Sequence, residues 1–295
     1  MRVFVTGATG FIGSAVVQDL LRAGHTVLGL SRSDAGAEAL ASAGAEVHRG
    51  DLEDLDSLRS GAAASDGVIH LGFVHDFSRF QEVCQIDKRA IEAMGDELAG
   101  SNRPLVVTSG LFLSPGSVAT EDVEIPANYP IARVSEQTAS QFAARGVRVS
   151  VVRLPQVHDT RKQGLVTYLI ASAREKGVSA YVGDGLNRWP AVHVLDAAPL
   201  YRLALEKGPA GARYHAVAEE GVPLREIAEA IGRGLKVPVV SKSPEEAAGH
   251  FGLLGFFVGA DGPASSALTQ ERLGWRPTQK AGMIEDLDNM DWSGE

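Results

Sequence analysis

The sequence lacks several features that mark secreted and membrane proteins. Its 295 residues include one cysteine, Cys84, which permits no internal disulfide bond and suits a reducing compartment. No apolar run approaches the roughly 20 residues that a membrane helix needs, and Thr6, Gly7 and Gly10 interrupt the apolar amino-terminal stretch. We therefore interpret that stretch as part of the fold and expect a cytoplasmic protein with no membrane partner.

Positive charge is also scarce. Lysine and arginine total 28 against 37 aspartate and glutamate residues, which gives a net charge of −9. No basic run is longer than a pair such as Arg161-Lys162, whereas a surface that follows nucleic-acid phosphates needs clustered cations. The eight histidines show no spacing typical of metal ligands. We expect a small-molecule partner, no nucleic-acid partner and no metal site.

Glycine is in excess: 33 of the 295 residues are glycine, about 11%, whereas the average share is roughly 7%. Near the amino terminus, residues 3–5 and 26–30 are short apolar runs typical of buried strands. Between them Ile12, Val16 and Leu20 recur at helical spacing, and Gly24 marks the end of the helix. This order predicts a strand, a helix and a second strand.

The same alternation continues through apolar runs at residues 46–48, 67–71, 104–108 and 147–152. Repetition of strand and helix with nearly continuous apolar strands predicts an α/β fold, a doubly wound parallel sheet with helices on both faces. Such sheets bind ligands beyond the carboxyl ends of their strands.

The chain changes character after about residue 155, where loops become longer and richer in glycine and proline. We predict a first domain over residues 1–157 and a smaller substrate-binding lobe over residues 158–295. The second lobe is expected to be discontinuous and partly interleaved, because strands near 191–194 and 212–217 could return to the first sheet.

Residues 6–13 read Thr-Gly-Ala-Thr-Gly-Phe-Ile-Gly and lie between the first predicted strand and the first helix. Gly7 permits a tight turn, Gly10 lets a pyrophosphate approach the backbone, and Gly13 lets the helix lie close to the sheet. The amino end of the helix adds free N–H donors and a positive dipole. The motif predicts a dinucleotide-binding Rossmann domain.

This Thr-Gly-x-x-Gly-x-x-Gly motif resembles that of the extended or atypical short-chain dehydrogenase/reductase superfamily, which includes the NAD-dependent epimerases and dehydratases. Further similar segments lie at residues 50–52, 70–72, 153–158, 189–196 and 273–277. The resemblance implies a nicotinamide cofactor and, since dimers are common in the superfamily, a possible homodimer. It also implies that the cofactor is bound by Gly7, Thr9, Gly10, Phe11, Ile12, Gly13, Ser31, Arg32, Ser33, Asp51, Leu52, Leu71, Gly72, Phe73, Arg133, Pro155 and Val157.

The end of the second predicted strand bears on which cofactor is preferred. NAD sites usually place an acidic side chain there for the ribose 2′-hydroxyl, and a basic side chain accommodates the 2′-phosphate of NADP. Arg32 stands at this position and favours NADP. NAD stays possible if Arg32 is merely solvated and Asp34 reaches the ribose.

Tyr129 and Arg133 have the spacing of the Tyr-x-x-x-Lys pair that the superfamily uses for proton transfer. Arginine keeps the positive charge that lowers a phenol pKa, but its planar group is larger and gives up no proton. In the alternative interpretation, Tyr129 is a loop residue and Arg133 pairs with Glu136 or Gln137 at helical spacing.

The superfamily also uses a hydroxyl after the fifth strand to hydrogen-bond the substrate oxygen. Thr108 and Ser109 are the candidates, with Ser109 preferred, although the expected register places Gly110 at that position. Either hydroxyl could instead cap the loop backbone.

These features together predict an NAD(P)-dependent oxidoreductase that transfers a hydride between nicotinamide and a small carbonyl or alcohol substrate. Two alternatives keep the same fold. One is a nucleotide-sugar epimerase with tightly bound NAD, and the other is a catalytically idle regulatory protein that senses NADP.

Overall fold

The computed structural model describes residues 1–111, 117–125 and 133–293. Its larger part is a seven-stranded sheet with the order β10-β6-β5-β4-β1-β2-β3, in which all neighbouring strands are parallel. The predicted α/β, doubly wound architecture is therefore confirmed. The strands are β1 (Arg2–Thr6), β2 (Thr26–Ser31), β3 (Glu46–Arg49), β4 (Gly67–His70), β5 (Pro104–Gly110), β6 (Arg148–Leu154) and β10 (Ala212–His215).

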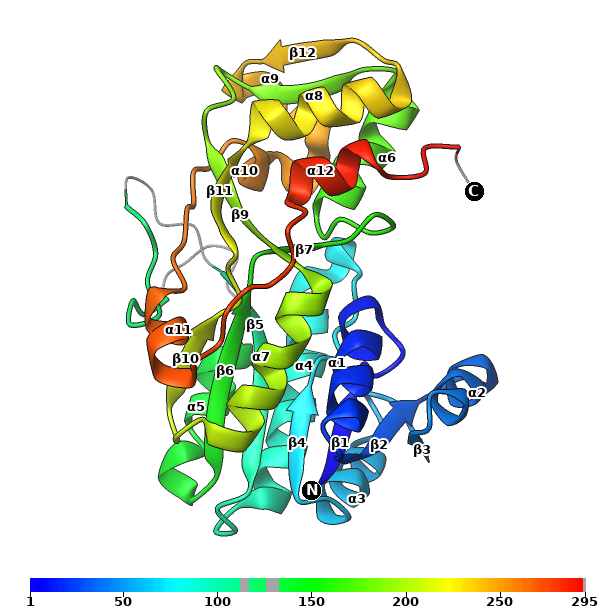
Figure 1. Ribbon diagram of the computed structural model, residues 1–295, viewed down its shortest axis with the longest axis vertical. Helices are drawn as coiled ribbons and strands as arrows, with labels where there is room; N and C mark the ends of the chain where they lie inside the picture. Colours follow the sequence, from blue (N-terminus) through cyan, green and yellow to red (C-terminus); the bar gives the residue numbers. More distant parts are fainter. Residues whose placement is uncertain (112–116, 126–132, 294–295) are drawn as a thin grey trace.

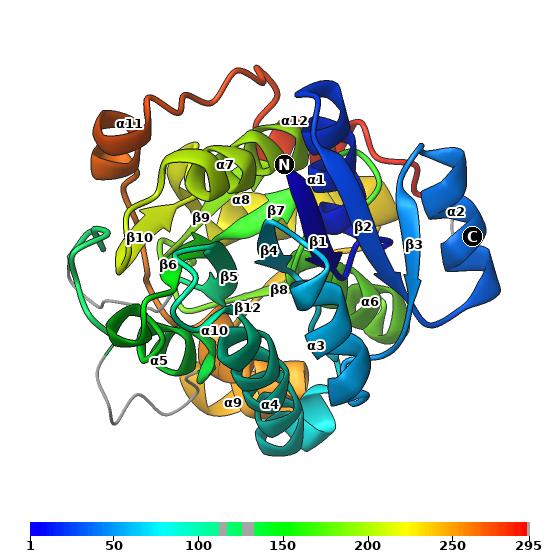
Figure 2. The ribbon, with the colours of Figure 1, turned by 90° about the horizontal axis from the view of Figure 1, so that it is seen from below.

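Helices cover both faces of this sheet, as Figure 2 shows. Alternate strand residues point to opposite faces, so Val3 and Val5 pack with helices α1 and α7, whereas Phe4 packs with α3 and α4. Each face thus has its own apolar core. The helices of this part are α1 (Phe11–Arg22), α2 (Asp34–Ser42), α3 (Leu55–Ala63), α4 (Phe80–Leu98), α5 (Ser135–Ser140) and α7 (Val194–Lys207), with short 3-10 turns η1 (Phe77–Arg79) and η2 (Ala143–Arg145).

A smaller lobe lies beyond the carboxyl ends of the sheet strands (Figure 1). It has a separate apolar core, and a three-stranded sheet of β7, β9 and β11 extends toward it from the larger part. Its elements are β7 (Gln156–His158), α6 (Val166–Lys176), β8 (Ser179–Val182), β9 (Arg188–His193), β11 (Glu219–Pro223), α8 (Leu224–Leu235), β12 (Val239–Lys242), α9 (Pro244–Phe251), η3 (Gly252–Leu254), α10 (Gly255–Val258) and α12 (Met283–Asp288); α11 (Ala267–Leu273) returns to pack beside β10.

One of the two strands expected to return to the first sheet does so. Residues 212–215 form β10 at its edge, beside β6, but residues 191–194 do not join it, so that expectation is wrong. Instead β9 pairs with β7 and β11. The reason is packing, because Trp189 of β9 is buried in the core of the smaller lobe and donates a hydrogen bond to the Phe257 carbonyl at 3.2 Å.

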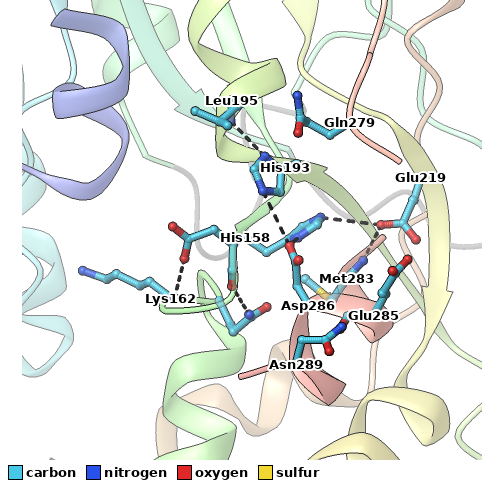
Figure 3. A network of polar contacts seen from close by, with 12 residues as sticks. His158, Lys162, His193, Leu195, Glu219, Gln279, Met283, Glu285, Asp286 and Asn289 are labelled. Atoms are coloured by element: carbon cyan, nitrogen blue, oxygen red, sulfur yellow. Dashed lines mark hydrogen bonds and ion pairs between the residues drawn. The ribbon is translucent and has the colours of Figure 1, made fainter. Parts of the chain in front are cut away.

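A network of histidines and carboxylates fastens the carboxyl-terminal helix α12 to the strands that join the lobes (Figure 3). His158 Nδ1 lies 2.7 Å from Asp286 Oδ2, and His158 Nε2 lies 3.6 Å from Glu219 Oε1. His193 caps α7, since its Nδ1 accepts a hydrogen bond from Leu195 N at 3.1 Å. Although burial alone would raise the pKa of Glu219, the nearby His158 and a hydrogen bond from Met283 N at 2.8 Å hold that pKa below the usual range.

Within the ranges that the structure describes, no helix is long and apolar enough to cross a membrane.

Candidate cofactor site and catalytic edge

The glycine turn has the geometry that its spacing predicts. Gly7 has a φ of +66°, and a Cβ there would lie 2.7 Å from Gly72 N. A Cβ on Gly13 would lie 1.9 Å from Gly7 O, which is backbone that cannot move aside cheaply. The turn leaving β1 therefore depends on glycine at both positions, and it packs directly against the loop after β4.

Gly10 serves a different purpose from its two neighbours. A Cβ there would meet, among the described residues, a single close atom, Gly7 O at 3.1 Å, so the fold restricts this position less than Gly7 or Gly13. Gly10 is exposed and directly precedes α1, whose first N–H groups, from Phe11 to Gly13, have no partner within the helix. The turn therefore fits a diphosphate, which needs backbone access and N–H donors at this point.

The end of β2 is organised by hydrogen bonds in which Arg49 takes part. Ser31 Oγ donates to Ser33 O at 3.0 Å, and Ser33 Oγ caps α2. Arg49 lies opposite Ser31 in the pairing of β2 with β3, and donates from Nη1 to Ser33 O at 2.7 Å and from Nη2 to Asp34 Oδ1 at 2.8 Å. Arg32 is exposed on the same loop. The guanidinium of Arg32 thus lies on this loop, and that of Arg49 lies against it. Asp34, the alternative ribose ligand, is paired with Arg49.

Sequence reasoning missed Arg49. The signal was its place as the last residue of β3, directly before the segment at residues 50–52 that resembles the superfamily's adenine-side loop. Which residue of β2 it faces depends on the strand register, and that register is a tertiary feature.

The remaining expected cofactor residues lie along the same edge of the sheet. Leu52 packs closely against Gly72: a Cβ added to Gly72 would lie only 2.8 Å from Leu52 Cδ2. Leu71 N donates to Thr6 O at 3.3 Å, which ties the loop after β4 to the end of β1. Asp51 follows β3 and accepts a hydrogen bond from Glu53 N at 3.0 Å. Pro155 is half-buried between β6 and β7, and Val157 is buried within β7.

The hydroxyl candidates after β5 differ in their surroundings. Thr108 is buried, donates from Oγ1 to His70 O at 2.8 Å and lies 3.0 Å from the Tyr201 hydroxyl, so its hydroxyl is used inside the protein. Ser109 is the next residue and is also buried. A Cβ on Gly110 would meet no atom of the described residues within 4 Å, so nothing in the described part of the chain fills the position of the expected hydroxyl.

Tyr129 lies outside the described residues. Arg133 lies within them, at the start of the segment that leads into α5. Its Cζ is 3.8 Å from the centroid of the Phe73 ring, and its Nη2 is 3.4 Å from Asp87 Oδ1. Phe73 is the residue directly after Gly72.

Of the two alternative partners expected for Arg133, Glu136 or Gln137, the structure contradicts Glu136. Glu136 accepts hydrogen bonds from the fully buried Arg153 at 2.8 and 2.7 Å and from Arg213 Nε at 2.8 Å. Both of its oxygens are therefore used on the other side of α5, and the partner of Arg133 is on α4 instead.

Asp87 is a functional candidate that sequence reasoning did not single out. It is 1% exposed on the apolar face of α4, beside Val83 and Ile86. Burial alone would raise the pKa of Asp87, but the hydrogen bond with His70 and the charge of Arg133 outweigh burial and hold the pKa below its usual range. The available signal was an acidic residue within an otherwise apolar helix stripe, which requires a buried partner.

His75 lies close to the same group of residues. Its ring is 5.6 Å from that of Phe73, in an edge-to-face arrangement. Burial lowers the pKa of His75, and the nearby positive charges of Arg133 and Lys162 lower it further.

Comparisons with known proteins identify the family of the chain. Residues 3–217 match the model of the NAD dependent epimerase/dehydratase family. An uncharacterized protein of Schizosaccharomyces pombe is 54% identical over 289 residues, which are 97% of this chain and 98% of that protein. A sterol-4-alpha-carboxylate 3-dehydrogenase (decarboxylating) of Dictyostelium discoideum is 28% identical over 244 residues, 76% of this chain and 73% of the relative.

Among solved structures, a dTDP-glucose 4,6-dehydratase of Streptomyces venezuelae superposes with a TM-score of 0.78 at 20% identity, covering 99% of this chain and 96% of that one. At that identity the likeness concerns the fold alone. The family match and the sequence relatives go further: the chain belongs to the NAD-dependent epimerase/dehydratase family, within the extended short-chain dehydrogenase/reductase superfamily.

Proposed function

We propose that the protein is an NADP-dependent oxidoreductase that acts on a small carbonyl or alcohol substrate. One observation carries the proposal, namely that the glycine turn and Arg133 meet at the same edge of the sheet. Gly72 packs on Gly7, and the next residue, Phe73, holds the Arg133 guanidinium 3.8 Å above its ring. A phosphate cradle and the cation of the expected catalytic pair are thus adjacent.

The preference for NADP is supported by the loop after β2. Arg32 is exposed there, and the guanidinium of Arg49 lies against the same loop. The Asp34 carboxylate, which could otherwise accept a ribose 2′-hydroxyl, is engaged by Arg49 at 2.8 Å. Guanidinium groups suit a phosphate because they present several donors in one plane.

When bound, the nicotinamide supplies or takes up a hydride at C4. In our proposal Tyr129 gives a proton to the substrate oxygen or takes one from it. Arg133 follows four residues later in the sequence; its charge would favour the deprotonated phenol, and it could also hold a ribose hydroxyl. Ser109 orients the substrate oxygen, since the Thr108 hydroxyl is already bonded to His70 O and Tyr201.

The sequence relatives include both a dehydrogenase, 28% identical over 76% of this chain, and a UDP-glucose 4-epimerase, 26% identical over 99% of it, so they do not choose between the two reactions. We favour the oxidoreductase over an epimerase with tightly bound NAD because Arg32 and Arg49 at the loop after β2 suit the 2′-phosphate of NADP. The idle, NADP-sensing alternative draws on Gly110, because a hydroxyl is absent where the superfamily register expects one.

The direct test is turnover. Purified protein with NADPH and a panel of aldehydes and ketones should consume NADPH faster than NADH, and Tyr129→Phe should abolish this consumption. Turnover that persists in the Tyr129→Phe variant contradicts the proposed proton donor. NADPH binding without turnover of any substrate supports the sensing alternative instead.

The cofactor preference has its own test. Arg32→Gln should weaken NADPH binding about tenfold and leave NADH binding nearly unchanged. Arg22→Gln, at an exposed arginine at the end of α1, is the matched control and should change neither. Equal weakening of both cofactors by Arg32→Gln would contradict a role at the 2′-phosphate.

We further propose a cytoplasmic setting, in which the free, buried Cys84 stays reduced, and a homodimer. Light scattering coupled to size-exclusion chromatography tests the second statement, and a mass of one chain contradicts it.

A further inference from the structure

We propose that Asp87 is a positioning residue that fixes Arg133 for the nicotinamide-ribose half of the cofactor. The inference rests on the proposed function, in which Arg133 contacts the cofactor. Asp87 itself is 1% exposed and lies behind Arg133, so it acts through the arginine and not on the ligand.

The protons of the Asp87 network follow from its hydrogen bonds. Thr6 Oγ1 accepts from Gly72 N at 3.1 Å, which leaves its own hydrogen to donate to His70 Nδ1 at 2.7 Å. In this assignment His70 donates from Nε2 to Asp87 Oδ1 at 3.1 Å. Ser135 Oγ donates to the other oxygen, Oδ2, at 2.5 Å. With this assignment, every donor and acceptor named in this hydrogen-bond network has a partner.

Both Asp87 oxygens are therefore held, and the carboxylate cannot turn. A buried carboxylate needs a compensating charge, and Arg133 provides it with Nη2 at 3.4 Å from Oδ1. The Phe73 ring makes a second contact with the guanidinium, and the Arg133 side chain stays 21% exposed. Arg133 Nε is buried and has no hydrogen-bond partner among the described residues, so a ligand would meet the guanidinium at its exposed part.

The network suits an arginine at a position where the superfamily has lysine. Arginine has a longer side chain and a planar group with a fixed direction, so its use as a ribose ligand depends on orientation. A rigid carboxylate and an aromatic ring supply that orientation. The same hydrogen bonds reach Gly72 and Thr6, which border the glycine turn, so Arg133 is fixed relative to the phosphate cradle.

The test separates the two halves of the cofactor. NADPH contains the nicotinamide ribose, whereas 2′,5′-ADP carries only the adenosine side with its 2′-phosphate. We expect Asp87→Asn and Arg133→Met each to raise the Kd for NADPH about tenfold in calorimetric titrations, because each loses a hydrogen bond that involves a charge. The Kd for 2′,5′-ADP should stay within about twofold of wild type.

A double variant distinguishes action through Arg133 from general damage. If Asp87 acts through Arg133, adding Asp87→Asn to Arg133→Met should cause no further loss of NADPH affinity. Asp96→Asn, an exposed aspartate on the same helix paired with Arg145, is the matched control and should bind both ligands like wild type.

Three outcomes would overturn the inference. The Asp87→Asn variant could bind NADPH like wild type, it could bind NADPH and 2′,5′-ADP with equally weakened affinity, or the losses of NADPH affinity could add up in the double variant. If Asp87→Asn does not fold, Ser135→Ala frees only Oδ2 and should produce a smaller loss that is still selective for NADPH. A Ser135→Ala variant with wild-type NADPH binding then overturns the inference. Failure of the wild-type protein to bind NADPH at all would reject the proposed function, and this inference with it.

Discussion

Alanine substitutions in the glycine turn separate folding from cofactor binding. In Gly13→Ala, the new Cβ would be 1.9 Å from Gly7 O, so α1 must move away from the turn. Forcing atoms into a packed site costs up to about 3 kcal/mol, and alanine returns about 1 kcal/mol through its helix propensity. We therefore expect a net loss of about 2 kcal/mol, which lowers Tm by roughly 5 °C in a chain of this size.

Gly10→Ala should behave in the opposite way. Its Cβ meets Gly7 O at 3.1 Å, and the local φ of −75° and ψ of 173° are open to alanine. Stability should fall by about 1 kcal/mol, less than in Gly13→Ala, because glycine is better than alanine at an N-cap position. The methyl group would nevertheless occupy the surface that a diphosphate must approach, so NADPH affinity should fall at least about tenfold.

The assay pairs thermal unfolding with calorimetric titration of NADPH on the same samples. Gly110→Ala is the control, since no described atom lies within 4 Å of its added Cβ, and it should leave both Tm and affinity nearly unchanged. Wild-type affinity in Gly10→Ala would refute phosphate binding at this turn. Wild-type stability in Gly13→Ala would refute the close approach of α1 to Gly7.

Three further predictions concern turnover, pH and the attachment of α12. Gly110→Ser should raise turnover with NADPH about tenfold if the missing hydroxyl limits the reaction, whereas Gly110→Ala should not. Burial lowers the pKa of His215 to about 4 from 6.5, so the unfolded chain takes up its proton first as the pH falls. The folded protein should therefore lose roughly 3 kcal/mol between pH 7 and 4, and urea unfolding of His215→Gln should show a flatter dependence on pH. Asp286→Asn, which weakens the 2.7 Å contact with His158, should cost about 1–3 kcal/mol in the same assay, whereas Asp288→Asn at an exposed ion pair should cost under about 1 kcal/mol.

The parts of the molecule that could be predicted from sequence depend on neighbours along the chain. The turn at residues 6–13 is defined by glycine spacing between an adjacent strand and helix, and Arg32 by its place directly after β2. The alternation of apolar strands and amphipathic helices likewise predicts the parallel sheet, because each crossover is encoded locally.

The parts that could not be predicted depend on contacts between distant segments. Arg49 reaches the loop after β2 only through the register of β2 with β3, and Asp87 meets Arg133 only when α4 packs against the segment before α5. Residues 191–194 have the composition of a strand, but composition does not say which strand it pairs with, and β9 joined the smaller sheet.

The central claim is that the turn from Gly7 to Gly13 holds the diphosphate of a nicotinamide dinucleotide. Calorimetric titration of the wild-type protein with NADPH, NADP, NADH and NAD tests it most directly. We predict one molecule bound per chain, with NADPH and NADP bound at least about tenfold more tightly than NADH and NAD. Absence of binding by all four nucleotides at millimolar concentration would contradict the claim.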